Sequence, residues 1–215
     1  MARRKKKISL ITFILILLAL IVIRFVEEID KDVPLQGRFV VSKVIDGDTF
    51  ELQGGDKVRL LSIDTPEKGE SYYNEAKELL KKYTYGKQVT LTYAETRRDR
   101  YGRLLAYVHV DSIFVNKQIL ENGLGYLYLF KDTESNLKLT KELLSSQQDA
   151  IRSQRGIWSM SHSPEDYYLN KDGSFRLHRP GCNSVKKLIP GKYQRFDNRI
   201  DGFNTGLSPC RNCKP

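Results

Sequence analysis

The chain has 215 residues, 40% of them hydrophobic, which excludes a protein disordered throughout and leaves room for one well-buried domain with a small appendage. Its 36 Lys and Arg residues outnumber 26 Asp and Glu residues, for a formal net charge of +10. This excess favours an anionic partner, either nucleic acid or an acidic membrane surface.

The amino terminus has the pattern of a membrane anchor. Met1–Lys7 contains five basic residues, and the sixteen residues that follow, Ile8–Ile23, are uncharged. Such a run is just long enough to span a bilayer, so we expect residues 1–26 to form a cytoplasmic basic stub and one transmembrane helix. Residues 27–36 would be a tether, with the rest of the chain outside the cell. Secretion after signal cleavage is the alternative, although no small-residue cleavage site follows the apolar run.

Residues 37–159 have the pattern of one α+β domain. Period-two alternation predicts strands and helical spacing predicts helices. We expect strands over Gly37–Ile45, twice within Phe50–Ile63, over Gln88–Ala94 and over Leu104–Val110, and helices over Glu70–Tyr83, Val115–Asn122 and Glu134–Ser153. Five strands with a helix after the third match a five-stranded OB-type β-barrel with three helices.

The stretch Val44–Glu67 crowds charge between two strands of a predicted hairpin. Antiparallel pairing would bring Asp48 and Asp64 to one edge of the sheet, with Thr65 in the loop beyond. Oxygen ligands of this kind suit a hard cation such as calcium. Asp46 has two interpretations, because it can lie near such a cation or cap the Asp-Gly turn.

A second charged block, Asp99–Arg103, has an arginine on each side of a Tyr-Gly pair. A β-turn of this composition can present guanidinium groups to a phosphate. An ordinary solvated hairpin is the alternative.

The motifs IDGDTFEL, VRLLSIDTPE and DRYGRLLAY follow one another in the order and at the spacing of the staphylococcal nuclease (thermonuclease) family, which the chain resembles over Gly37–Trp158. The resemblance implies a calcium-dependent phosphodiesterase that cuts DNA and RNA and leaves 3′-phosphates and 5′-hydroxyls. It also implies roles for single residues: Asp48, Asp64 and Thr65 as calcium ligands, Glu67 as general base or water-positioning group, and Arg59 and Arg103 as ligands of the scissile phosphate.

Further substrate contacts are expected from the charged turn and from the aromatic run after Gly125. The candidates for stacking or phosphate contact are Arg100, Tyr101, Tyr126 and Tyr128. Core packing is the alternative for the tyrosines.

All three cysteines lie near the carboxyl terminus, after a predicted linker over residues 160–173. His178, Cys182, Cys210 and Cys213 have the spacing of a tetrahedral zinc site. A disulfide with one thiol left over is the alternative. Residues 174–215 resemble the metal-binding domain of the Ada DNA-repair protein, with a histidine in place of the first of its four cysteines. We expect a structural zinc and, from the basic excess of this segment, an accessory nucleic-acid-binding role.

The sequence therefore predicts a membrane-anchored, extracytoplasmic, calcium-dependent nuclease that acts on DNA, RNA or both and carries a small zinc-binding domain. The alternative is a non-catalytic OB-fold module that only binds nucleic acid. A binding module has no need of all five charged residues that the resemblance places at the site, which favours the enzyme. We infer no protein partner.

Overall fold

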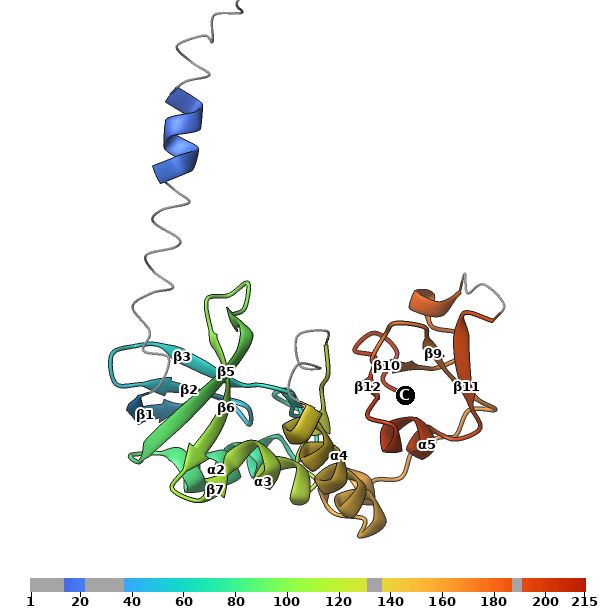
Figure 1. Cartoon of the computed structure of the whole chain (residues 1–215). Helices are drawn as coiled ribbons and strands as arrows, with labels where there is room; N and C mark the ends of the chain where they lie inside the picture. Colours follow the sequence, from blue (N-terminus) through green and yellow to red (C-terminus); the bar gives the residue numbers. More distant parts are fainter. Residues whose placement is uncertain (1–13, 22–36, 131–136, 187–190) are drawn as a thin grey trace, which may run out of the picture. The chain divides into compact units, whose positions relative to one another are not determined.

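A computed structural model describes residues 14–21, 37–130, 137–186 and 191–215 (Figure 1). The chain divides into two compact units, residues 1–35 and 36–215. The second unit contains every motif discussed above except the amino-terminal one.

The amino-terminal unit corrects the predicted membrane anchor. Residues 14–21 form a helix with exposed side chains. Within the described ranges, no helix has the length and apolar character needed to cross a membrane. The predicted transmembrane helix, single-pass localisation and membrane partner are wrong on this finding. The remainder of the predicted stub, anchor and tether, residues 1–13 and 22–36, lies outside the described residues.

The second unit is built on a closed barrel. Its sheet has the strand order β3-β2-β1-β5-β6-β7, and β3 also pairs in parallel with β6, which closes the first five strands. The strands are β1 (Arg38–Val44), β2 (Thr49–Leu52), β3 (Lys57–Leu60), β5 (Gln88–Arg98), β6 (Leu104–Val110) and β7 (Ile113–Phe114). The predicted five-stranded OB-type barrel is therefore confirmed.

The three predicted helices are present as well. They are α2 (Tyr73–Thr84), α3 (Val115–Glu121) and α4 (Leu137–Arg152), followed by the short 3-10 helix η2 (Gly156–Ser159). Helix α2 buries Ala76 and Leu80, which lie four residues apart on one face. Figure 1 shows α2 and α3 beneath the barrel strands.

A break after β3 redirects the chain toward the site. Ser62 has a left-handed backbone conformation, with φ of 63°, so the continuous strand expected up to Ile63 ends at Leu60. Strand β4 (Ile63–Asp64) then pairs with β8 (Tyr126–Leu127) in a separate two-stranded sheet. This pairing places Asp64 opposite Tyr126 in the second sheet, with its carboxylate beside Arg59 of β3.

The carboxyl-terminal part forms a four-stranded sheet with the order β11-β9-β10-β12. Its elements are β9 (Tyr168–Lys171), β10 (Arg176–His178), η3 (Asn183–Val185), β11 (Tyr193–Phe196), α5 (Arg199–Asn204) and β12 (Ser208–Pro209). Strand β9 lies inside residues 160–173, where we expected a linker. The sheet therefore begins before residue 174, because β9 has a strand partner on each side.

One apolar core joins this sheet to the nuclease-like part of the unit. Trp158 makes an edge contact with Tyr126 at 5.2 Å and with Phe203 of α5 at 5.4 Å between ring centroids. Ala150 of α4 and Leu177 of β10 belong to the same buried cluster. Burying aromatic rings from both sides holds the carboxyl-terminal sheet against the rest of the unit.

Candidate active site and metal centre

Arg59 lies at the centre of the acidic hairpin. Its Nη1 contacts Asp48 Oδ1 at 2.5 Å, and its Nη2 contacts Asp64 Oδ1 at 3.1 Å. Burial acts to lower the pKa of Arg59, but the two carboxylates outweigh it and raise that pKa. The structure thus brings together two buried acids and one partly buried, permanently charged guanidinium.

Close backbone packing holds the loop after β4 beside Asp48. The Thr65 N–H donates to Asp48 Oδ2 at 3.4 Å. A Cβ on Gly125 would lie 3.0 Å from the Asp64 carbonyl oxygen, and one on Gly47 would lie 2.8 Å from Thr65 Oγ1. Both positions need glycine because other backbone or side-chain atoms occupy the space.

The Asp46 carboxylate makes the turn-capping contact that one of its two interpretations predicts. Its Oδ1 accepts a hydrogen bond from the Asp48 N–H at 3.1 Å, the pattern of an aspartate capping its own turn. Burial, followed by the charge of Asp48, raises the pKa of Asp46.

Arg103 is fixed by Asp99, a partner that the sequence did not indicate. Nε and Nη2 of Arg103 contact Asp99 Oδ2 at 2.8 and 2.7 Å, while Nη1 reaches Thr49 Oγ1 at 3.5 Å. Burial raises the pKa of Asp99, but the hydrogen bonds from Arg103 and Tyr101 prevail and lower it. Asp99 therefore stays charged and orients the guanidinium.

These groups line one cavity of about 430 Å³, which we call the arginine cavity. Its lining includes Asp46, Asp48, Arg59, Thr65, Glu67, Asp99, Arg100, Tyr101, Arg103, Tyr128 and Arg211. Glu67 is exposed, and its backbone N–H donates to Glu70 Oε2 at 2.8 Å, which fixes the loop that carries it. Every residue that the resemblance assigned to calcium or to the phosphate lines this cavity, with the exception of Asp64. The Asp64 carboxylate instead contacts two of the lining residues, Arg59 and Arg211.

The tyrosine candidates have three different environments. Tyr101 is 68% exposed and lies under the Arg100 guanidinium, 4.8 Å from the ring centroid. Tyr128 lines the arginine cavity, but Arg176 covers its ring at 3.6 Å. Tyr126 packs among Trp158 and Phe203, so its ring serves the core described above. Tyr101 is thus the most accessible of the three rings.

Arg211 was not among the predicted site residues. It lies in the segment Cys210–Cys213, which we call the knuckle, and its Nη2 donates to Asp64 Oδ1 at 2.6 Å. The two residues are 147 positions apart. The sequence carried no local signal for this contact beyond the basic character of the tail.

The predicted zinc ligands also come together. Parallel pairing of β10 with β12 aligns Leu177 with Pro209, which brings His178 beside Cys210. One ligand atom from each of the four predicted residues lies within 4.8 Å of the others. All three cysteines are free thiols, and the Cys182 and Cys210 sulfurs are 4.0 Å apart, too far for a disulfide.

His178 supplies an independent indication of a metal. Its buried Nδ1 has no hydrogen-bond partner among the described residues. Burial, with the charge of Arg176, lowers the pKa of His178 and keeps the imidazole neutral, the form that binds metals. A buried polar nitrogen without a partner is costly unless it serves as a ligand.

The fold and the site together define a class: OB-type barrel proteins in which arginines and carboxylates line one cavity. Comparisons with known proteins agree. The family model described as staphylococcal nuclease homologue matches residues 57–160. A thermonuclease of Staphylococcus intermedius is 31% identical over 170 residues, which cover 71% of this chain and 98% of the relative.

Two further relatives extend this comparison. An uncharacterized endonuclease of Escherichia coli O157:H7 is 36% identical over 129 residues, 58% of this chain and 78% of the relative. The SPbeta prophage-derived endonuclease YokF of Bacillus subtilis is 33% identical over 165 residues, 71% of this chain and 52% of the relative. The chain belongs to the staphylococcal nuclease family, and nuclease activity is the function that this membership supports.

Proposed function

We propose that this protein is a calcium-dependent nuclease that hydrolyses phosphodiester bonds of DNA, RNA or both and leaves 3′-phosphate products. The observation that carries the proposal is the arginine cavity, where Arg59, Arg103 and Glu67 surround a space suited to one phosphate. A phosphodiester is anionic, and the N–H donors of the two guanidinium groups that their carboxylate partners leave free can bind its non-bridging oxygens.

Calcium fits the acids of this site. Asp48 and Asp64 are buried carboxylates, and Thr65 lies beside them with a backbone carbonyl, so the set consists of hard oxygen donors. Asp48, Asp64 and Thr65 would hold the ion, which when bound supplies positive charge near the reacting phosphate.

Three side chains have distinct roles in the proposed reaction. Glu67 accepts a proton from the attacking water, whose oxygen forms the new bond to phosphorus. Arg59 and Arg103 stabilise the charge that builds on the non-bridging oxygens. The bond from phosphorus to the 5′ oxygen then breaks, and the leaving oxygen takes up a proton, which gives a 3′-phosphate and a 5′-hydroxyl.

A cleavage assay on the full chain with calcium or with a chelator tests this proposal. Replacing Asp48 by asparagine should raise the calcium concentration needed for half-maximal rate by at least about tenfold, because a charged ligand is lost. The matched control is Asp56→Asn, which changes a half-exposed carboxylate on the β2–β3 turn, paired with Arg98.

The products should carry 3′-phosphates, which end-group analysis can verify. A folded protein that binds single-stranded DNA and RNA with calcium present but cuts neither would favour the alternative, a module that only binds nucleic acid. Products with 5′-phosphates would contradict the proposed bond cleavage.

We also propose that His178, Cys182, Cys210 and Cys213 hold one structural zinc ion. The sulfur separation of 4.0 Å between Cys182 and Cys210 is close to that of two thiolates on a common ion with zinc–sulfur distances of about 2.3 Å. In the Ada-like motif this chain has a histidine in place of one of the four cysteines. Alkyl transfer, the chemistry of the Ada protein, therefore has no support here, and we assign the ion a structural role. A link to the Ada metal-binding domain rests on the motif alone.

Metal analysis of the purified chain should find about one zinc per molecule. Cys210→Ser should lose the metal and unfold the carboxyl-terminal sheet, since metal binding and folding are coupled in so small a unit. The single Trp158 packs on Phe203 and should then shift its emission to the red. His178→Cys, which keeps four ligands, should retain the metal. A metal-free native protein with unchanged Trp158 emission would contradict the assignment.

A further inference from the structure

The knuckle contributes to the nuclease site from outside the nuclease-like sequence. Arg211 lines the arginine cavity together with Arg59 and Arg103. Its side chain is 59% exposed, so only part of its hydrogen-bonding capacity is used by Asp64. A guanidinium has five N–H donors, and those not used by Asp64 remain for an anion.

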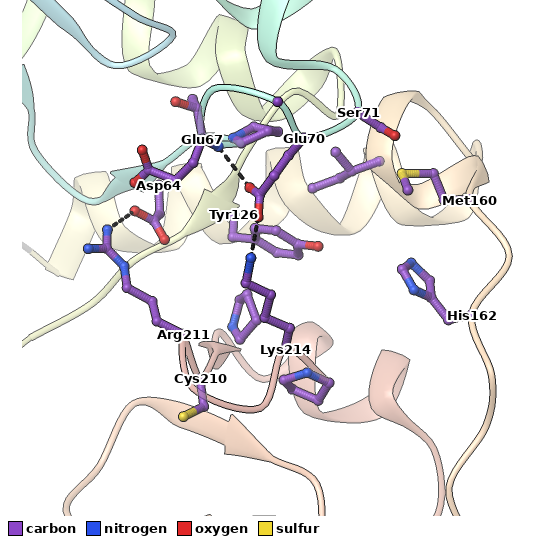
Figure 2. Close-up of a pocket in the computed structure, with 16 residues that line it drawn as sticks. Asp64, Glu67, Glu70, Ser71, Tyr126, Met160, His162, Cys210, Arg211 and Lys214 are labelled. Carbon is purple, nitrogen blue, oxygen red and sulfur yellow. Dashed lines mark hydrogen bonds and ion pairs between the residues drawn. The ribbon is translucent and has the colours of Figure 1, made fainter.

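A second cavity begins on the other side of this contact. It has a volume of about 520 Å³, and we call it the knuckle cavity. One wall is residues 64–71 apart from Lys68, and the opposite wall is Pro209–Pro215 apart from residues 212 and 213 (Figure 2). Thr65, Pro66, Glu67 and Arg211 line both cavities, so the two spaces adjoin beside the Arg211–Asp64 ion pair.

The walls of the knuckle cavity combine apolar surface with charged groups of both signs. Tyr126, Ile157 and Met160 supply apolar surface, and Lys214 supplies a second positive charge beside Arg211. Figure 2 shows Lys214 directed at Glu70 across the cavity, where the two form an ion pair. A nucleotide has the same two faces, an apolar base and an anionic phosphate, and cavities of about 300–1,000 Å³ hold ligands of that size.

We propose that the knuckle cavity is a nucleotide subsite next to the catalytic position, and that Arg211 binds the backbone phosphate adjacent to the scissile one. This inference rests on the proposed function. A strand that passes from the arginine cavity into the knuckle cavity must cross beside Arg211, because that residue lines both. Its positive charge also offsets Asp64 and Glu67, which would otherwise repel the incoming phosphate.

Two of the four predicted zinc ligands are close to Arg211 in the chain. Cys210 and Cys213 flank Arg211, and the Lys214 N–H donates to the Cys210 carbonyl oxygen at 2.8 Å. Two ligands bound to one ion would fix the backbone on both sides of Arg211. The carboxyl-terminal sheet would then serve to position a substrate-binding arginine.

Strand binding by the full chain tests the subsite. A Glu67→Gln background prevents turnover, and the probe is a labelled single-stranded hexanucleotide with calcium present. Adding Arg211→Ala should weaken binding about tenfold, as expected for a lost charge-assisted contact. It should also lower the slope of log affinity against log salt by about 0.7, the value for one phosphate on a single strand. The matched control is Arg195→Ala, an exposed arginine of β11 that lines neither cavity.

Comparing ligands of two lengths distinguishes binding at the subsite from general electrostatic attraction of nucleic acid to the protein. A dinucleoside monophosphate has only the scissile phosphate, so its affinity, measured by displacement of the probe, should not change in the Arg211 variant. Ser71→Trp fills the knuckle cavity from the opposite wall. It should weaken binding of the hexanucleotide and leave the affinity for the dinucleoside monophosphate unchanged. Unchanged zinc content would show that the carboxyl-terminal sheet remains folded in the variants.

Equal losses in the Arg211 and Arg195 variants, or equal losses for both ligands, would overturn the inference. These outcomes differ from failure of the proposed function, which would appear as an absence of cleavage by the wild-type chain with calcium. An unaltered hexanucleotide affinity in both the Arg211 and the Ser71 variants would also exclude the subsite.

Discussion

Replacing Glu67 by glutamine should lower turnover by about 10²–10⁴-fold and leave nucleic-acid affinity nearly unchanged. The glutamine has the same shape but cannot accept the proton of the attacking water. Glu67 is exposed, and the described residues offer its carboxylate no hydrogen bond that the fold would lose. Single-turnover rates at saturating calcium, together with binding to an oligonucleotide, measure the two quantities separately.

Glu75→Gln is the matched control, because Glu75 is an exposed carboxylate in the first turn of α2 and lines neither cavity. It should keep the parental rate. If turnover of the Glu67 variant falls by less than about tenfold, Glu67 is not the general base, because a general base accounts for a factor of at least about 10² in rate.

Replacing Arg103 by alanine should lower turnover by about 10²–10³-fold, the effect of removing one preorganised donor from a developing charge. Lysine should not restore the rate, because its ammonium group lacks the planar pair of donors that fits phosphate. The fold should persist, since Asp99 Oδ1 keeps backbone hydrogen bonds from Tyr101 and residue 103 at 2.9 and 3.0 Å.

Two other arginines help to interpret this variant. Arg100→Ala should affect KM more than kcat, because Arg100 is exposed on the same turn and is not held by Asp99. Arg152→Ala, on the surface of α4, should change neither. If the Arg103 variant raises KM and leaves kcat unchanged, Arg103 binds the ground state only, and its role in stabilising the transition state is excluded.

Local pattern was sufficient to predict the barrel and its helices. Period-two alternation and the Asp-Gly and Gly-Gly turns specify a hairpin over short distances, and that hairpin brings Asp48 and Arg59 together through the pairing of Thr49 with Arg59. The cysteine and histidine spacing likewise identified a cluster that the structure assembles, because metal-ligand spacing is itself a local pattern.

Length and hydropathy were not sufficient at the amino terminus. The apolar run predicted a spanning helix, whereas the described residues contain no helix that is long and apolar enough to cross a membrane. The segment predicted as a linker shows a related difficulty. Strand β9 has a polar, turn-rich neighbourhood, and only its pairing with β10 and β11 makes it a strand.

The sequence by itself determined the barrel, its acidic hairpin and the members of the Cys/His cluster, because each depends on residues close together in the chain or on a motif. Only the tertiary structure decided which ring is free and which arginine reaches the site. Tyr126 is partly buried against Trp158 and Phe203, and its remaining surface lines the knuckle cavity. Arg211 reached Asp64 because that same core holds the carboxyl-terminal sheet in place, and a contact across 147 positions is set by packing rather than by local pattern.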